Sequence, residues 1–459
     1  MTPADQRKNL FIKTWGCQMN VYDSRKMADV LAPLGYHEQT EPEGADMMIL
    51  NTCHIREKAT EKLYSELGRM RAFKTEKEAQ GQQMILAVAG CVAQAEGDAV
   101  FDRAPFVDMV IGPQTYHRLP EMVAEITGAY GKARVIDTDF PAESKFDHLP
   151  EEALPQGPSA YVSVQEGCDK FCTFCVVPYT RGAEYSRPVA QVLDEVRRAV
   201  RAGAQEIILL GQNVNAYHGE DAQGQDCSLG RLIHYVAEIA GVERIRYTTS
   251  HPRDVDEELI VAHRDVPQLM PYLHLPVQSG SDPVLKLMNR KHTVETYRRI
   301  IERFREARPD IAFSSDFIIG FPGERQADFE ATMQLVRDVG FAGAYSFKYS
   351  PRPGTPGANM GGIVPEKVKT ERLTALQELL NEQQIAFNKS CVGMRMPVLF
   401  DRKGRKGDTQ LMGRSPWNQS VFVEANPRLY GRILDVDIDR AGPNSLTGKL
   451  VLQDPDQRA

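Results

Sequence analysis

Three cysteines in the segment GCDKFCTFC have the spacing of an iron–sulfur cluster site. Cys168, Cys172 and Cys175 follow the pattern C-x3-C-x2-C, with an aromatic residue directly before the last cysteine. Three thiolates on one tight loop can each bind one iron of a [4Fe–4S] cube, which leaves the fourth iron without a protein ligand. Such an open iron can be chelated by the amino and carboxylate groups of a small molecule. Zinc is the competing interpretation, but it commonly takes four protein ligands and no second cysteine pair stands nearby.

Three dispersed cysteines predict a second cluster. Cys17, Cys53 and Cys91 end the segments LFIKTWGC, ADMMILNTC and MILAVAGC, so each follows a short apolar run. If these runs are neighbouring parallel strands, they end at one edge of a sheet and their thiols converge there. Three buried small hydrophobic residues are the competing interpretation, but the repeated position at strand ends favours a cluster. Cys227 and Cys391 lack this context and are expected to be structural.

The composition is that of a globular protein. Of the 459 residues, 42% are hydrophobic and 25% are charged. No run approaches the length of about 18 apolar residues that a membrane span needs. Residues 1–10 are polar and of mixed charge, unlike a signal peptide. In a reducing cytoplasm, clustered cysteines more often bind metal or do chemistry than form disulfides. We therefore expect a cytoplasmic protein that does not associate with a membrane.

The sequence divides into three stretches by the periodicity of its apolar residues. In residues 8–127 apolar strands alternate with helical patterns, which predicts an α/β domain with a parallel sheet. Residues 128–157 are rich in Pro, Asp and Glu and are expected to be a linker. Residues 154–387 hold about six βα units in a row, typical of a partial (β/α)6, TIM-like barrel. Residues 390–455 change to short strands with Gly and Pro turns, which predicts a small all-β barrel.

The same patterns predict where the elements lie. In the first stretch we expect strands at Leu10–Ile12, Met47–Leu50, Met84–Val88 and Phe106–Ile111, with helices at Ser24–Leu34 and Glu57–Phe73. In the second we expect strands at Tyr161–Val164, Glu206–Leu210, Arg244–Thr248, Tyr272–Leu275, Ala312–Ile319 and Gly343–Phe347. In the third we expect strands at Val398–Phe400, Ser420–Glu424, Arg432–Ile438 and Lys449–Leu452.

Charge is unevenly distributed along the chain. The net charge is −7, yet residues 387–459 contain 12 Lys or Arg and 8 Asp or Glu, so this tail carries +4 and the rest −11. A basic tail on an acidic body can bind a polyanion locally. Candidate phosphate contacts are Arg395, Arg402, Lys403, Arg405, Lys406 and Arg414, and Trp417 is a candidate for stacking on a base. The competing interpretations are a solvated loop surface for the charges and core packing for the tryptophan.

In combination, the motifs resemble those of the radical S-adenosylmethionine methylthiotransferases. They are TWGCQMN, NTC, AGC, EGCDKFCTFCVVPYTRGAE, LHLPVQSGSD, MNRKHT, DFIIGFPGE and FKYSPRPGTPGA, and they cover nearly the whole chain. The resemblance implies a methylthiotransferase N-terminal domain at 8–127, a radical S-adenosylmethionine core at 154–387 and an RNA-binding TRAM barrel at 390–455. It also implies S-adenosylmethionine and two [4Fe–4S] clusters as cofactors, with the cluster cysteines Cys17, Cys53, Cys91, Cys168, Cys172 and Cys175 as metal ligands.

Within this family, TWGCQMN and TRGAE resemble the members that act on N6-dimethylallyladenosine (i6A) at position 37 of tRNA. The implied reaction replaces a C–H bond of the base with C–S–CH3. It uses two molecules of S-adenosylmethionine and sulfur from the cluster on the dispersed cysteines, hereafter the auxiliary cluster. The implied partners are the anticodon loop of tRNA and an electron donor such as flavodoxin or ferredoxin, and the protein is expected to act as a monomer.

Polar residues after the central strands are expected to bind S-adenosylmethionine. Asn213, Ser250, Gln278 and Asp316 lie near the carboxyl ends of successive predicted strands, which is where α/β barrels bind ligands. Each of them could instead be a turn or cap residue. No side chain is assigned a catalytic role.

Two alternatives remain open from the sequence. One is a related methylthiotransferase that acts on another modified adenosine or on a ribosomal protein. The other is a non-catalytic iron–sulfur sensor that binds RNA, which would not consume S-adenosylmethionine.

Overall fold

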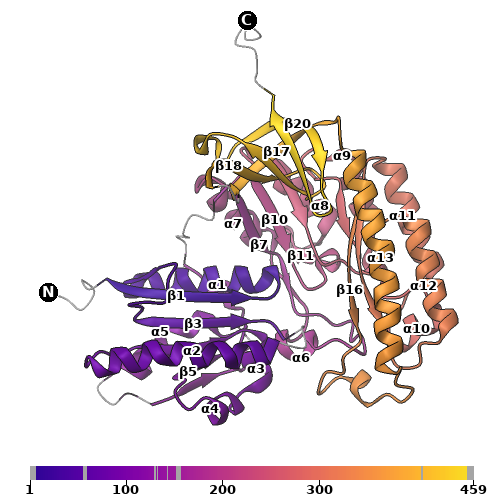
Figure 1. The fold of residues 1–459 in the computed structure, drawn as a ribbon. Coiled ribbons are helices and arrows are strands. Elements are labelled where there is room, and N and C mark those ends of the chain that lie inside the picture. The colour runs from indigo at the N-terminus through magenta and orange to yellow at the C-terminus, as the bar shows by residue number, and fades with distance from the viewer. Residues whose placement is uncertain are drawn as a thin grey trace, which may run out of the picture. The chain divides into compact units, whose positions relative to one another are not determined.

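The computed structural model describes residues 7–54, 59–128, 131, 133–141, 143–150, 157–404 and 407–451 (Figure 1). The chain forms two compact units. The first consists of Met1–Leu154, Glu166–Asp169 and Cys175–Tyr185, and the second of Pro155–Gln165, Lys170–Phe174 and Ser186–Ala459. The loop with three cysteines therefore contributes to both units.

The first unit is built on a parallel sheet, as expected. Its strands lie in the order β2 (Tyr36–Glu38), β1 (Lys8–Trp15), β3 (Met47–Thr52), β4 (Ile85–Ala89), β5 (Met109–Ile111) and β6 (Val135–Asp137). The central strands β3 and β4 are buried along their whole length. A strand buried on both faces requires apolar residues at successive positions, and this explains the continuous run of Met47 to Leu50.

Helices cover both faces of this sheet. Helices α1 (Gln18–Leu31) and α5 (Leu119–Thr127) pack on one face. Helices α2 (Ala59–Ala79), α3 (Cys91–Glu96) and α4 (Ala99–Arg103) pack on the other face. Helix α1 begins six residues before the predicted Ser24. Its first turns bury polar residues such as Asn20 and Asp23, so the apolar periodicity that marks a helix is absent there.

The expected linker at residues 128–157 was wrong in part. Strand β6 extends the sheet beyond β5, and the short 3₁₀ helix η4 (Lys145–His148) buries Lys145 and Phe146. β6 has only three residues, and only the first of them is buried. So short an edge strand carries almost no alternation of apolar and polar residues.

The second unit contains the central barrel-like domain. Parallel strands form two sheets, one in the order β13 (Arg244–Tyr247), β10 (Glu206–Leu210) and β7 (Ser159–Ser163), the other in the order β14 (Tyr272–His274), β15 (Ala312–Ile319) and β16 (Gly343–Lys348). A parallel bridge between Ile245 and Leu269 connects the end strand of the first sheet to the segment before β14. This confirms the partial barrel.

Amphipathic helices enclose these strands: α7 (Val189–Arg201), α8 (Leu229–Ala237), α9 (Glu257–Asp265), α11 (Val294–Ala307), α12 (Gln326–Val339) and α13 (Glu366–Ser390). In α11, Thr293 accepts a hydrogen bond from the backbone N–H of Thr296 and caps the first turn. Tyr297, Ile301 and Phe304 then recur at helical spacing and are buried in the core.

The last stretch is a closed barrel with the strand order β17 (Arg395–Gly404), β18 (Gly407–Arg414), β19 (Ser420–Glu424), β21 (Ser445–Leu450) and β20 (Ile433–Ala441). The small all-β barrel is confirmed, although β18 was not predicted. This strand is Gly-rich and polar at both ends. Among the described helices, none is long and apolar enough to cross a membrane.

The closed barrel packs against strand β13 of the same unit through buried arginines. The Arg244 guanidinium donates to the carbonyl oxygens of Pro397 and Arg414, and Arg246 donates to those of Ser415 and Pro416. These contacts satisfy carbonyl groups that would otherwise be desolvated without a donor.

Buried His263 gives the central domain a pH-dependent stability. The Nε2 atom of His263 lies 2.7 Å from the Tyr247 hydroxyl. Burial, with a smaller effect from the charge of Arg308, lowers the pKa of His263 to about 3. The unfolded chain takes up a proton near pH 6.5 and the folded protein does not, so the free energy of unfolding falls as the pH drops below that value. Between pH 7.5 and 5.5 the parent should lose about 1.4 kcal/mol relative to His263→Gln. Urea unfolding at both pH values measures this, and an equal pH dependence in the two proteins would contradict it.

Candidate metal centres

The three dispersed cysteines follow neighbouring strands at one edge of the sheet. Cys17 comes two residues after β1, Cys53 directly after β3, and Cys91 two residues after β4. The strands are in register, since Trp15 lies opposite Thr52 and Asn51 lies opposite Ala89. The backbone N–H of Cys53 also donates to the carbonyl oxygen of Trp15 at 3.1 Å. The three cysteines therefore follow neighbouring strand ends in the structure, as their sequence context predicted.

Glycines let the loops that carry these cysteines approach one another. Gly16 has a φ of +130°, and a Cβ at this position would lie 2.8 Å from Cys53 Sγ and 2.9 Å from Asn20 Oδ1. Gly90 has a φ of +87°, and a Cβ there would collide with Asn51 Oδ1. Both the backbone conformation and the space require glycine at these two positions.

A pair of buried asparagines connects the segments that carry Cys17 and Cys53. Asn20 Nδ2 donates to Asn51 Oδ1 at 3.0 Å, and Asn51 Nδ2 donates to the carbonyl oxygen of Asn20 and to Ser24 Oγ, both at 2.8 Å. The Cys17 thiol donates to Asn20 Oδ1 at 3.3 Å. Sequence reasoning missed Asn20. The available signal was a polar residue three positions after the first cysteine, on the side of the helix that faces the sheet.

The environment of the Cys17 thiol opposes its deprotonation. Desolvation by the surrounding protein raises the pKa of the Cys17 thiol, although the residue lies at the exposed edge of the sheet. The Arg181 guanidinium lowers this pKa, while the charges of Cys91 and Cys53 raise it. Because neighbouring thiolates raise the pKa of Cys17, its deprotonation is favoured only when a cation takes up the combined charge.

The loop with three cysteines is fixed at both ends by backbone contacts. In the first unit, the N–H of Cys168 donates to the carbonyl oxygen of Gly182 at 3.3 Å. Gly167, with a φ of +76°, packs so closely on Ala183 that a Cβ would lie 2.5 Å from its carbonyl carbon. In the second unit, the N–H of Thr173 donates to Met288 O at 3.1 Å. All three of these cysteines are reduced thiols.

Arg290 is a buried cation beside the second cysteine of this loop. Its Nη1 lies 3.5 Å from Cys172 Sγ, and its Nη2 donates to the carbonyl oxygen of Pro276 at 2.5 Å. An N–H donor to a ligating sulfur stabilises the thiolate and tunes the potential of a bound cluster. Sequence reasoning quoted the segment MNRKHT but assigned no role to its arginine.

Three of the predicted S-adenosylmethionine contacts follow the carboxyl ends of strands, and the fourth, Asp316, lies within β15. Asn213 follows β10 and Ser250 follows β13, and the two loops are joined by a 2.9 Å bond from Val214 N to Thr249 O. Gln278 follows β14 and pairs with β15 beside Asp316, with Gln278 N donating to Asp316 O at 3.0 Å. The structure thus joins the four residues in two pairs.

The side chains of Asn213 and Ser250 have unused polar atoms. Asn213 Nδ2 donates to Asp254 Oδ2 at 2.8 Å. Its Oδ1 and the hydroxyl of Ser250 are buried and have no hydrogen-bond partner among the residues that the structure describes. A buried polar atom without a partner is costly, so these two atoms are suited to a polar ligand.

Comparison with known proteins places the three parts of the chain. The uncharacterized protein family UPF0004 matches residues 9–112, the radical SAM superfamily matches residues 162–336, and the TRAM domain matches residues 389–451. A tRNA-2-methylthio-N(6)-dimethylallyladenosine synthase from Maricaulis maris (strain MCS10) is 61% identical over 448 residues, 97% of each chain. The chain belongs to this synthase family.

Solved structures share the fold of the synthase at low sequence identity. The radical S-adenosylmethionine methyltransferase TsrM from Kitasatospora setae, with cobalamin and a [4Fe-4S] cluster bound, has a TM-score of 0.54 and 12% identity over 85% of this chain and 76% of its own. The cobalamin-dependent radical enzyme OxsB has a TM-score of 0.51 and 14% identity over 82% of this chain and 56% of its own. At these identities the likeness shows the fold alone.

The residues present fit the cofactors of the synthase family, which are S-adenosylmethionine and two [4Fe–4S] clusters. The described residues contain no group of three or more His, Cys, Asp or Glu placed to hold a single metal ion. A cube is bound differently, because each thiolate binds a separate iron and the sulfurs stand apart. Two sets of three reduced thiols, each with a polar or cationic neighbour, suit this chemistry.

Two of the candidate phosphate contacts form ion pairs within the barrel. Arg395 pairs with Asp437 at 2.8 Å, and Arg402 pairs with Asp401 at 2.9 Å. Arg405 and Lys406 lie outside the described residues. Trp417 donates its indole N–H to Asp310 O at 2.8 Å and packs edge-on against Phe387, which favours a packing role over base stacking.

Proposed function

We propose that the protein is a MiaB-type enzyme that converts N6-dimethylallyladenosine at position 37 of tRNA to its 2-methylthio derivative. The observation that carries this proposal is the 61% identity over 97% of both chains to a synthase of that name. Two separate cysteine triads in one chain support it, since the reaction needs a radical generator and a source of sulfur.

In this proposal Cys168, Cys172 and Cys175 hold the radical cluster, and Cys17, Cys53 and Cys91 hold the auxiliary cluster. When bound, the clusters supply the electron that cleaves S-adenosylmethionine and the sulfur that enters the product. The protein orients the ligands and excludes water.

Asn213, Ser250, Gln278 and Asp316 form the proposed S-adenosylmethionine site. The free Oδ1 of Asn213 and the Ser250 hydroxyl are suited to the amino and hydroxyl groups of the cofactor. The carboxylate of Asp316 lies 3.6 Å from His274 Nε2 on the neighbouring strand. A carboxylate beside an imidazole at a strand end can accept hydrogen bonds from a ribose.

For recognition, we propose that the barrel formed by β17 to β21 binds tRNA and helps to present the anticodon loop. Its match to the TRAM domain supports this role. The electron donor is proposed to be a flavodoxin or ferredoxin, and the enzyme to act as a cytoplasmic monomer.

The deciding experiment is mass spectrometry of tRNA nucleosides from a deletion strain. We expect 2-methylthio-N6-dimethylallyladenosine to disappear and its precursor N6-dimethylallyladenosine to accumulate, with recovery when the gene is restored. An unchanged nucleoside profile would refute the proposed substrate. A sensor without activity would release no 5′-deoxyadenosine when the purified holoprotein is reduced with S-adenosylmethionine present.

A further inference from the structure

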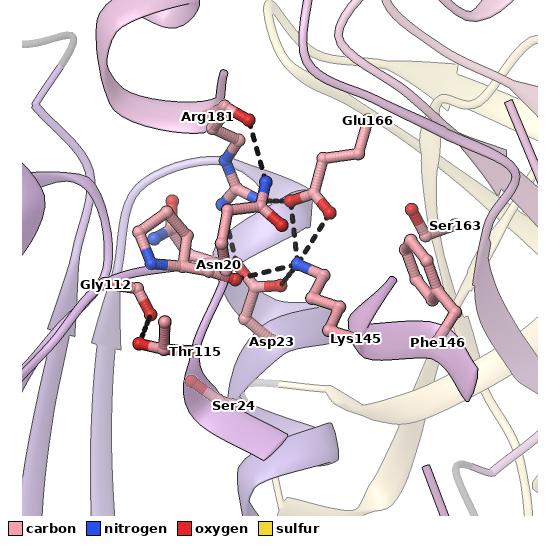
Figure 2. Close-up of polar contacts among 12 residues, drawn as sticks. Asn20, Asp23, Ser24, Gly112, Thr115, Lys145, Phe146, Ser163, Glu166 and Arg181 are labelled. Carbon is pink, nitrogen blue, oxygen red and sulfur yellow. Dashed lines mark hydrogen bonds and ion pairs between the residues drawn. The ribbon is translucent and has the colours of Figure 1, made fainter. Parts of the chain in front are cut away.

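Four charged side chains form a buried ion cluster in the first unit. Arg181 Nη2 lies 2.6 Å from Asp23 Oδ2, and Arg181 Nη1 lies 2.5 Å from Glu166 Oε1. Lys145 Nζ lies 2.6 Å from Glu166 Oε2 and 3.7 Å from Asp23 Oδ1. Figure 2 shows the four side chains pointing toward one another. Each side chain is at most 3% exposed, so the two acids and two bases balance one another almost without solvent.

Each acid and base of this cluster comes from a segment next to a cysteine or from the expected linker. Asp23 lies on α1, which begins directly after Cys17. Glu166 stands two residues before Cys168, and Arg181 stands six residues after Cys175 on helix α6 (Val177–Arg181). The cluster therefore joins both ends of the three-cysteine loop to the helix that starts at the auxiliary site.

The surroundings of Arg181 bring its charge to the auxiliary thiols. Helix α6 packs against α3, whose first residue is Cys91, and the paired Asp23 lies on the helix capped by Cys17. Gln114 Nε2 donates to the carbonyl oxygen of Arg181 at 2.7 Å and fixes the end of α6.

Stability alone is a weak reason to keep such a cluster. Desolvating four charges offsets most of their mutual attraction, and well-packed apolar side chains in the same space are often as stabilising. A buried guanidinium that is fixed by two carboxylates does supply one thing that apolar residues cannot, namely a positive charge at a defined place.

We propose that Arg181 is a positioning residue that holds positive charge beside Cys17 and Cys91 and thereby raises the reduction potential of the auxiliary cluster. This inference rests on the proposed function, because it requires a cluster on these cysteines. Asp23, Glu166 and Lys145 fix the orientation of the guanidinium. A nearby positive charge stabilises the reduced, more negative form of a cluster, so its loss shifts the potential to more negative values.

The test is a mediated redox titration of the full-length protein in which Cys168, Cys172 and Cys175 are replaced by alanine. Only the auxiliary cluster then contributes to the spectrum. In this background Arg181→Gln is expected to shift the midpoint potential to a more negative value. Arg181→Lys keeps the positive charge, so its midpoint potential is expected to stay near that of the background protein. The control Arg372→Gln removes a buried guanidinium that pairs with Glu324 in the second unit, and it should leave the potential unchanged.

If Arg181→Gln does not fold, a charge-balanced comparison replaces it. Asp23→Asn with Arg181→Gln removes one acid and one base, and its potential should be more negative than that of Asp23→Asn alone. Full iron content with no shift, or an equal shift in Arg181→Lys and Arg181→Gln, would overturn the inference while leaving the proposed function intact. A background protein that binds no cluster would overturn both.

Discussion

Replacement of Cys53 by alanine is expected to leave cleavage of S-adenosylmethionine near the parent rate and to abolish formation of the methylthio product. Cys53 is buried at the end of β3 and faces Gly16, so its loss removes one of three thiolates from the auxiliary site. The other loop keeps its cysteines and its contacts to Gly182 and Met288. With only two thiolates left, the auxiliary cluster should be lost and no sulfur should be available for insertion.

The reciprocal variant is Cys172→Ala. Cys172 is the cysteine that receives the Arg290 N–H, so this variant should lose the radical cluster and cleave no S-adenosylmethionine. Anaerobic assays of 5′-deoxyadenosine and of the modified nucleoside, together with iron analysis, separate the two lesions. Equal loss of both activities in the two variants would show that the sites are not separable.

Cys227→Ala is the matched control for these substitutions. Burial raises the pKa of the Cys227 thiol to about 11, and the residue packs in the core of the central domain. A neutral buried thiol of this kind acts as a small apolar group. We therefore expect full iron content and both activities in this variant.

Some features of the fold could be read from the sequence because local pattern and tertiary environment agree. Strands β10, β15 and β19 have the predicted bounds. The buried parallel strands are continuous apolar runs, and α11 has apolar residues at helical spacing. The cysteines after β1, β3 and β4 lie at one edge of the sheet because parallel strands end together.

The residues that support the site could not be read in this way. Asp23 and Arg181 are 158 positions apart, and Lys145 lies in a segment whose composition is that of a linker. A buried charge has no periodic signal, and its partner is defined only by the tertiary fold. The same reason explains why Arg290 and Asn20 were missed. Strand β18 was missed because its polar ends and glycines lack strand propensity.

Gly167→Ala is expected to destroy the radical site while leaving the auxiliary site loaded. Gly167 precedes Cys168 and has a φ of +76°, a conformation that costs a residue with a Cβ about 1 kcal/mol. The added Cβ would also lie 2.5 Å from the carbonyl carbon of Ala183 and 2.7 Å from the carbonyl oxygen of Gly182. Overpacking of this kind costs a further 1–3 kcal/mol, roughly, and is relieved only by moving the backbone.

That movement is expected to disrupt the hydrogen bond that holds the start of the loop, because Cys168 N donates to the same Gly182 carbonyl oxygen. We expect iron content to fall by about half, since one cube of two is lost, and S-adenosylmethionine cleavage to disappear. Gly44→Ala is the matched control: Gly44 has a φ of +74° but open space around its Cβ position, so it reproduces the backbone strain without the collision. If both variants lost iron equally, backbone strain rather than contact with Ala183 would be responsible. If Gly167→Ala kept full iron and full cleavage, the close packing of this glycine would not be what holds Cys168 in place.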